Sequence, residues 1–329
     1  MLPPSHLWPI DEVWNYHAGG GVFKTIDVFN EALRRRYGWA PGVERYAMKA
    51  QVQAYETHRA MFEAFGRNKY EDATGVIQWM LNDAWPSLIW HLYDYFLRPG
   101  GSYFGTKKAC EPLHIQYSYD DRSVVVVNSR RRAYKGLRAR AEVYNFDLSR
   151  KFTREAELDA GPDSSIRALT IPEIDGLTKT YFVRLELREP GGRVVSRNFY
   201  WLSTEAETLD WDRTEWYYTP TKTYADYTAL DQLEEVALEV SRSFEDRASE
   251  QVARVRVKNP TKTLAFAVRL RVLRASDGEE ALPVLWEDNY FALMPGEERE
   301  VTAVYPKEAL GESAAVVAVD GWNVAPASR

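Results

Sequence analysis

Aromatic and polar side chains gather in a short segment of the chain around residue 80. Trp79, Asn82, Asp83 and Trp85 lie close together there. The flat face of a tryptophan can stack on a sugar ring, and an amide or carboxylate can hydrogen-bond the hydroxyls of that ring. The 11 Trp and 20 Tyr of the chain are more than packing usually requires, although most such rings belong to a core. The segment therefore indicates either a sugar-binding surface or core packing, and Asp83 could equally cap a helix that begins near Pro86.

The histidines and the single cysteine do not form a metal-binding pattern. The chain contains one Cys and five His, namely His6, His17, His58, His91 and His114. No two of these histidines have the close spacing that is typical of zinc ligands. A single cysteine also excludes a disulfide within the chain. We therefore expect no metal site and no other cofactor.

The charge balance excludes some classes of partner. The formal net charge is −6 and the sequence pI is about 5.6. A nucleic-acid surface would need a basic stripe to displace counterions from phosphates. No apolar run reaches the roughly 18 residues that a membrane-spanning helix needs. We expect neither nucleic acid nor membrane as a partner. The first 20 residues lack the basic and apolar regions of an export signal, which leaves the location of the protein open.

The elements that would carry the segment around residue 80 have an α/β pattern. Apolar residues recur at spacings of three and four from Val43 to Phe65, which predicts a long amphipathic helix. The nearly continuous apolar run Gly75–Leu81 predicts a strand that is covered on both faces. A second helix is predicted from Leu88 to Leu97, where Pro99, Gly100 and Gly101 follow. Residues 1–112 thus resemble the end of a barrel or sheet of alternating helices and strands.

The chain changes to strict alternation after Ile115. Leu137, Ala139, Ala141 and Val143 alternate with charged residues, which is typical of antiparallel strands with one buried face. About seven such runs before Trp201 predict a β-sandwich, and similar runs after residue 250 predict a second one. We expect the aromatic stretch from Ser203 to Asp226 to pack against its neighbours as it joins the two. The predicted domains are residues 1–112, 113–205 and 206–329.

Several separated segments carry a family resemblance. They are Thr74–Leu88 (TGVIQWMLNDAWPSL), residues 101–128 (GSYFGTKKACEPLHIQYSYDDRSVVVVN), YWLST at 200–204 with TLDW at 208–211, and WYYTPT at 216–221. In this order they resemble the C-terminal part of family 2 glycoside hydrolases. The branch that they resemble most is that of the exo-β-D-glucosaminidases, which is related to the β-mannosidases. The resemblance implies the last part of a (β/α)8 barrel followed by two immunoglobulin-like β-sandwich domains.

The resemblance also says where catalysis would occur. Family 2 enzymes retain the anomeric configuration and use two glutamates, an acid/base after barrel strand four and a nucleophile after strand seven, which must lie roughly 5 to 5.5 Å apart. The similarity begins after the nucleophile's strand, so both glutamates are expected upstream of Met1. Asp11, Glu12 and Asp83 do not have the sequence context of either glutamate. We therefore expect no catalytic residue in this chain and no activity of the chain alone, and the parent protein is expected to be secreted or periplasmic.

Six side chains are the candidates for contact with a sugar. Trp79 would stand at the end of the last barrel strand, where barrel active sites gather and where the family has an aromatic platform. Tyr16 and His17 precede Gly19–Gly21 and resemble the loop after the nucleophile's strand. The full set is Tyr16, His17, Trp79, Asn82, Asp83 and Trp85. The expected ligand is an oligosaccharide that ends in β-linked glucosamine or mannose, and the upstream part of the same enzyme is a possible partner.

Two alternative functions remain open from the sequence. A β-mannosidase or endo-β-mannosidase would share the barrel and the sandwiches. A noncatalytic carbohydrate-binding or scaffold protein would instead use exposed aromatics of the sandwiches, such as Trp211, Trp216 and Tyr218, to hold a polysaccharide. In each case residues 1–112 would leave an uncovered apolar face, so they should be poorly stable unless they pack on the sandwiches or self-associate.

Overall fold

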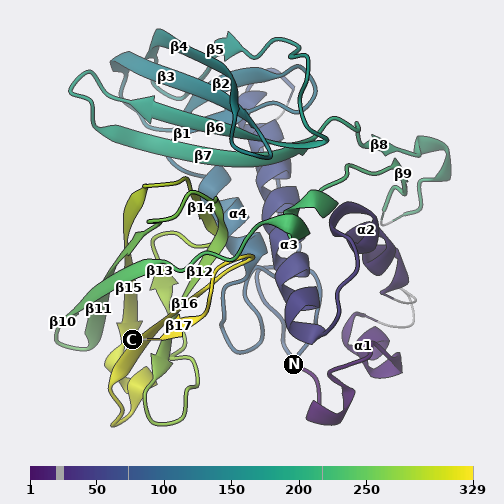
Figure 1. The fold of residues 1–329 in the computed structure, drawn as a ribbon, viewed down its shortest axis with the longest axis vertical. Helices are drawn as coiled ribbons and strands as arrows, with labels where there is room; N and C mark the ends of the chain where they lie inside the picture. The colour runs from purple at the N-terminus through teal and green to yellow at the C-terminus, as the bar shows by residue number, and fades with distance from the viewer. Residues whose placement is uncertain (20–25, 73, 217, 329) are drawn as a thin grey trace.

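The N-terminal third of the molecule is helical. The structure is a computed structural model that describes residues 1–19, 26–72, 74–216 and 218–328. After the 3₁₀ turn η1 (Pro4–His6), the helices are α1 (Glu12–His17), α2 (Asp27–Tyr37), α3 (Val43–Arg67) and α4 (Gly101–Ala109). Helix α3 is the predicted amphipathic helix, and its prediction is confirmed. It extends alongside both β-sandwiches (Figure 1) and buries Tyr46, Val52 and Tyr55. None of the described helices is both long and apolar enough to cross a membrane.

Helix α4 was not predicted, and it packs unusually close to α3. A Cβ atom at Gly101 would lie 1.9 Å from the backbone oxygen of Gln51, and one at Gly105 would lie 2.2 Å from that of Tyr55. Both distances are far below van der Waals contact. The two glycines therefore allow the backbones to approach where any side chain would separate the helices. The sequence pattern suggested only that Gly100 and Gly101 end an element, whereas they begin this one.

The strand predicted over Gly75–Leu81 is not formed. Ile77, Trp79 and Leu81 are 94%, 70% and 60% exposed. A parallel strand needs hydrogen-bonding neighbours, and the described residues place none beside this segment. Its backbone bonds are local instead, since Leu81 O accepts the N–H groups of Leu92 and Tyr93 at 3.0 Å each. The apolar pattern correctly marks residues that favour burial, but nothing in the described chain covers them.

The helix predicted over Leu88–Leu97 is also wrong. Asp94 Oδ1 accepts the backbone N–H groups of Phe96 and Arg98, each at 2.9 Å. This local turn competes with helical hydrogen bonds. Leu97 adopts a positive φ of 64°, and Pro99 disfavours a helical conformation of the residue before it. The segment is therefore an irregular loop that ends in an isolated bridge between Tyr93 and Pro99.

Seven antiparallel strands form the first sandwich. One sheet has the order β1-β2-β5 and the other β4-β3-β6-β7. The strands are β1 (Leu113–Tyr117), β2 (Ser123–Asn128), β3 (Tyr134–Asn145), β4 (Arg150–Ala160), β5 (Ser164–Thr170), β6 (Thr180–Arg188) and β7 (Val194–Ser203). The alternation predicted along β3 is confirmed, because Leu137, Ala139, Ala141 and Val143 are buried whereas Arg138 is exposed. These side chains form a core shared with Val183 and Leu185 of β6.

The second sandwich has two four-stranded sheets, β10-β11-β15-β13 and β14-β12-β16-β17. Its strands are β10 (Glu239–Asp246), β11 (Glu250–Lys258), β12 (Ala265–Arg274), β13 (Leu285–Trp286), β14 (Phe291–Leu293), β15 (Glu298–Pro306), β16 (Ala315–Asp320) and β17 (Ala327–Ser328), with the 3₁₀ turn η4 (Lys307–Leu310) after β15. Val255 and Val257 of β11 face the core and Arg254 and Arg256 face solvent, as the alternation predicts.

The connection between the sandwiches contains a projecting hairpin. It includes β8 (Thr208–Leu209), the 3₁₀ turn η2 (Trp211–Arg213) and β9 (Thr221–Thr223), and the 3₁₀ turn η3 (Thr228–Gln232) follows. Figure 1 shows β8 and β9 extending away from the sandwiches on the side of α2. The expectation that this aromatic stretch packs against its neighbours is confirmed near its end, where Ala225 is buried and the Tyr224 ring lies 5.4 Å from the Arg36 guanidinium, but it is wrong for Trp211, which is 71% exposed.

Buried charged side chains join the helices to the first sandwich. His114 on β1 lies between two carboxylates, with Nδ1 3.1 Å from Glu111 and Nε2 2.8 Å from Glu63 of α3. Asn198 of β7 donates to the same Glu63 oxygen at 2.7 Å. Burial alone would lower the pKa of His114, but the hydrogen bonds with Glu111 and Glu63 outweigh it, and the pKa is raised.

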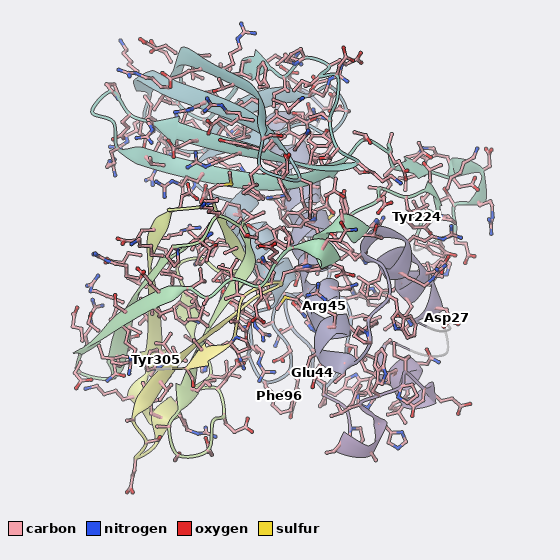
Figure 2. All side chains as sticks on the ribbon, in the orientation of Figure 1. Asp27, Glu44, Arg45, Phe96, Tyr224 and Tyr305 are labelled. Atoms are coloured by element: carbon pink, nitrogen blue, oxygen red, sulfur yellow. The ribbon has the colours of Figure 1, made fainter. Side chains whose placement is uncertain are left out.

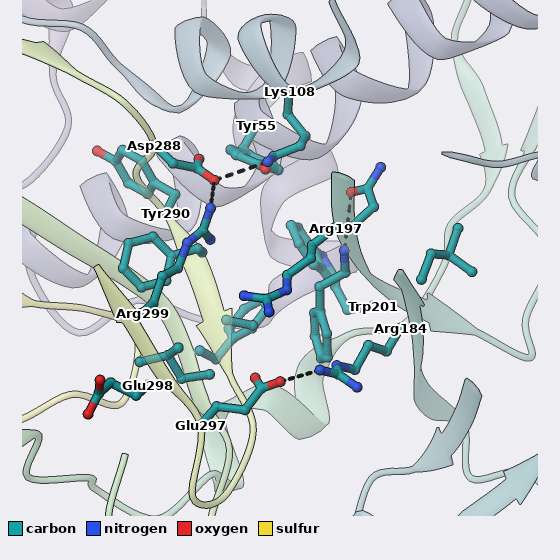
Figure 3. Close-up of a pocket in the computed structure, with 17 residues that line it drawn as sticks. Tyr55, Lys108, Arg184, Arg197, Trp201, Asp288, Tyr290, Glu297, Glu298 and Arg299 are labelled. Carbon is teal, nitrogen blue, oxygen red and sulfur yellow. Dashed lines mark hydrogen bonds and ion pairs between the residues drawn. The ribbon is translucent and has the colours of Figure 1, made fainter. Parts of the chain in front are cut away.

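The same network continues into the second sandwich. Lys108 Nζ lies 2.7 Å from Glu111 and 3.0 Å from Asp288, which also pairs with Arg299 (Figure 3). Burial would raise the pKa of Asp288, but Lys108 and Arg299 outweigh it and lower that pKa. At its other end α3 contacts the second sandwich again, because Arg45 donates to Trp322 O at 2.7 Å. The helical part thus packs on both sandwiches through desolvated ion pairs.

Candidate functional site

Three of the six candidate side chains meet at the end of α1. The ring centroid of Trp85 lies 5.4 Å from that of Tyr16 and 5.0 Å from that of His17. His17 also hydrogen-bonds Pro86 O through Nδ1, and its own carbonyl oxygen accepts Leu88 N at 2.7 Å. These bonds attach the loop after residue 82 to α1. Tyr16 and Trp85 remain exposed, so the aromatic cluster presents ring faces to solvent.

Helix α1 is positioned by its first residues. The Asp11 carboxylate caps it by accepting Val13 N at 3.0 Å and Trp14 N at 3.4 Å. His6 Nδ1 lies 2.6 Å from the same carboxylate and lowers its pKa. The buried Trp14 ring packs edge-on against Tyr46 of α3 at 5.3 Å. The cap and this packing fix the last turn of α1, which carries Tyr16 and His17.

Asp83 is the one candidate that is turned inward. It is only 6% exposed, and its carboxylate hydrogen-bonds Nδ1 of His91. The backbone oxygen of His91 in turn accepts the Ser102 hydroxyl of α4 at 2.9 Å. No described helix begins at Asp83, so the helix-cap interpretation of this residue is wrong. Its carboxylate braces the loop through His91, a contact that the sequence spacing did not reveal.

Trp79 and Asn82 lie on the same loop but apart from the cluster. Both are exposed, and no ring contact is found between Trp79 and the other candidates. Trp79 is 70% exposed, and its backbone oxygen accepts a hydrogen bond from Gln78 Nε2 at 3.1 Å. The structure therefore brings Tyr16, His17 and Trp85 together, buries Asp83, and leaves Trp79 and Asn82 as separate exposed side chains.

The acids near this surface have structural roles or positions. Asp11 caps a helix and bonds His6, Asp83 bonds His91, and Glu12 lies in the first turn of α1. Among the described residues, no group of three His, Cys, Asp or Glu is placed to hold a metal ion. The arrangement can stack on a sugar ring and hydrogen-bond its hydroxyls, whereas the carboxylates of Asp11 and Asp83, among the described residues here, are engaged in hydrogen bonds with His6 and His91.

A separate cavity of about 60 Å³ lies between the two sandwiches and the helices (Figure 3). Charged side chains that line it form ion pairs with one another, such as Arg184 with Glu297 and Lys108 with Asp288. None of the six candidate residues lines it. Because its lining comes from both sandwiches and from Tyr55 and Lys108 of the helices, this cavity belongs to the interface between these parts.

Comparison with known proteins places these features in a family. A model described as "Exo-beta-D-glucosaminidase Ig-fold domain" matches residues 216–324, and one described as "Mannosidase Ig/CBM-like domain" matches residues 120–204. The chain is 44% identical to an exo-β-D-glucosaminidase of Streptomyces avermitilis over 99% of its own length and 37% of that protein. It is 39% identical to the Amycolatopsis orientalis enzyme of the same name, over 98% of this chain and 32% of that one.

The crystal structure of the Amycolatopsis orientalis exo-chitosanase has a TM-score of 0.95 to this chain at 38% identity, and the match covers all of this chain and 40% of that one. The chain belongs to the exo-β-D-glucosaminidase branch of glycoside hydrolase family 2. The part of the relatives that it matches is their C-terminal region, and it spans about a third of their length. Its fold is therefore a C-terminal remnant of the (β/α)8 barrel followed by two immunoglobulin-like sandwiches. A β-mannosidase of Dictyoglomus thermophilum, with a TM-score of 0.69 at 16% identity, shares that fold.

Proposed function

We propose that this chain is the C-terminal part of a retaining exo-β-D-glucosaminidase that removes glucosamine from the ends of chitosan oligosaccharides. The observation that carries the proposal is the similarity of nearly the whole chain to enzymes of that name. The Amycolatopsis orientalis relative has been solved in complex with PNP-β-D-glucosamine. In this proposal both catalytic glutamates lie upstream of residue 1, and the chain by itself has no turnover.

The chain would contribute one wall of the sugar pocket. Trp85, supported by Tyr16 and His17, offers ring faces for stacking, and Trp79 acts as the platform under the terminal sugar. Asn82 hydrogen-bonds sugar hydroxyls. Asp83 takes a different role from direct contact, because its buried carboxylate holds the loop in place through His91.

The upstream part of the enzyme would complete this pocket. It would cover Ile77 and Leu81, whose exposure in this chain leaves apolar surface in water, and leave the Trp79 ring open to the sugar. The glutamate pair, roughly 5 to 5.5 Å apart, would then face the sugar held by Trp79. We also propose that residues 1–112, 113–205 and 206–329 are the barrel portion, the first sandwich, and the linker with the second sandwich.

The test compares variants in the protein that includes the upstream region. We expect Trp79→Ala to lower kcat/KM for PNP-β-D-glucosamine by at least 100-fold, because it removes the platform under the reacting sugar. Trp39→Ala is the matched control, since Trp39 is also an exposed tryptophan but lies between α2 and α3. Equal activity of the Trp79→Ala variant and the control would contradict the site assignment.

Specificity for the sugar is tested with the same protein. The β-mannosidase alternative predicts faster hydrolysis of a chromogenic β-mannoside, whereas our proposal predicts faster hydrolysis of the β-glucosaminide. The ratio of the two kcat/KM values decides between them, because the two sugars differ in the group at carbon 2 and its configuration. A ratio that favours the mannoside would overturn the proposed substrate.

A further inference from the structure

The tip of the β8–β9 hairpin (residues 204–223) holds two large aromatic side chains in solvent. Trp211 is 71% exposed and Trp216 is 73% exposed. Figure 1 shows the hairpin extending beyond the sandwich to which β7 belongs. Burying a side chain of this size stabilises a protein by roughly 2 kcal/mol or more, so two tryptophans left exposed on one hairpin forgo that stabilisation. Exposed apolar groups of this kind mark interaction sites.

Hydrogen bonds attach the base of the hairpin to helix α2. Glu207 forms two hydrogen bonds with Arg36 of α2, at 2.6 and 2.7 Å. The Arg36 guanidinium also lies 5.4 Å from the ring of Tyr224, which Figure 2 labels where the hairpin meets α2. Across the hairpin the hydroxyls of Thr208 and Thr223 are 2.6 Å apart. These contacts attach the base of the hairpin to α2 and join its two strands.

The turn at the tip is also organised. Asp210 N donates to Pro220 O at 2.8 Å, and the Thr214 hydroxyl donates to Trp211 O at 2.8 Å. These bonds fix the backbone at Trp211 while its ring remains in water. A rigid aromatic side chain that is already exposed loses little conformational freedom when a flat ligand stacks on it.

The charges around the two rings define the kind of ligand. Between residues 210 and 216 the acids Asp210, Asp212 and Glu215 are accompanied by one basic residue, Arg213. The tip is thus net negative and aromatic, which complements a ligand that has both flat faces and positive charges.

We propose that this tip is a second carbohydrate-binding site, in which Trp211 and Trp216 stack on β-linked glucosamine units and the nearby carboxylates attract their ammonium groups. The site is separate from the cluster of Tyr16, His17 and Trp85, and it would retain a polymer near the enzyme while one end reacts. The choice of polymer rests on the proposed function, but the binding itself needs no catalysis.

The experiment measures retention of the 329-residue chain in native gels that contain soluble chitosan. The wild-type chain is retarded, and the W211A/W216A variant loses at least tenfold in affinity. Both rings are exposed, so this variant keeps the thermal midpoint of the wild type. Phe244→Ala, which removes another partly exposed aromatic ring on β10, is the control and binds as the wild type does.

A second variant tests the charge complement. We expect Asp210→Asn with Asp212→Asn to weaken binding to chitosan and to reduce its dependence on salt, with little effect on binding to N-acetylated chitin oligomers, which lack the ammonium groups. In the protein that includes the upstream region, W211A/W216A should lower turnover of long chitosan but leave turnover of PNP-β-D-glucosamine unchanged.

The outcomes separate this proposal from the proposed function. Chitosan binding that is equal in the wild type and W211A/W216A, or absent in the wild type, overturns the second site. Loss of binding in W211A/W216A without glucosaminidase activity of the longer protein supports the second site and overturns the enzyme assignment. If the upstream region covers the tip, the longer protein binds chitosan equally with and without the two tryptophans, and the second site is again overturned.

Discussion

His114 is completely buried with a carboxylate on each side of its ring, and this arrangement makes its charge state part of the stability of the molecule. Glu63 and Glu111 raise the pKa of His114 above its ordinary 6.5 despite burial. The stabilisation that the charged ring provides is therefore fully present below pH 6.5 and is lost as the pH rises through the raised pKa. Glu111 behaves in the opposite sense. Burial would raise its pKa, but Lys108 and His114 hold it at about 2, so its contribution is lost only as the pH falls from 4.5 toward 2.

Replacement of His114 tests this network at the level of one residue. We expect His114→Gln to lower the free energy of unfolding at pH 6 by about 3 kcal/mol, because it leaves the buried carboxylate of Glu63 without the charged ring that it pairs with, whereas Glu111 keeps Lys108. Above pH 6.5 the difference from the wild type should shrink, and chemical denaturation at several pH values measures it. His58→Gln is the control on α3, where the ring only bonds Ala54 O, and it should cost under about 1 kcal/mol. A difference between H114Q and the wild type that does not change with pH would contradict the charged state of His114.

At the scale of elements, the contact between α3 and α4 depends on the absence of side chains. Gly105→Ala would place a methyl group 2.2 Å from Tyr55 O, so the helices would have to separate. We expect a loss of about 3 kcal/mol in the free energy of unfolding, which is at the upper end for overpacking. Gly191→Ala is the matched control, since nothing lies within 4 Å of the added atom. A thermal midpoint of Gly105→Ala equal to that of the control would show that the helices are not packed in this way.

Elements whose stability is local were predictable from the sequence, and those that depend on distant partners were not. The spacing of apolar residues from Val43 to Phe65 predicts the buried face of a single helix, and the alternation along β3 predicts the buried face of a single strand. Both predictions are confirmed. The run Gly75–Leu81 was predicted as a strand from its apolar character, but a strand also requires neighbours, which that character cannot supply. Likewise, the turn around Asp94 depends on one side chain that hydrogen-bonds the backbone ahead of it.

In the candidate site too, the sequence predicted some residues and missed the contacts between distant ones. Residue types and the family resemblance pointed to Tyr16, His17 and Trp85, and the structure brings these three together. The partners Asp83 and His91, and the network of Glu63, Glu111 and His114, were missed because no spacing along the chain marks contacts between different elements.

At the scale of the whole molecule, the exposed loop should be the first part to be cleaved. Ile77, Trp79 and Leu81 are exposed, and they lie outside the packed helices and sandwiches. We expect limited chymotrypsin digestion to cut between residues 74 and 97 and to spare residues 113–205 and 206–329, since cleavage follows local exposure. Mass spectrometry of the first fragments measures this. Early loss of the second sandwich with an intact loop would contradict both the proposed domain boundaries and the exposed state of the loop.

The most direct test of the account is the turnover of PNP-β-D-glucosamine by two purified proteins, the 329-residue chain alone and the same chain with its upstream sequence. We predict no turnover above background for the chain alone and kcat values of roughly 1 to 1,000 per second for the longer protein, as is typical of enzymes. Turnover by the chain alone would contradict the account, because a glutamate pair would then have to lie within residues 1–329.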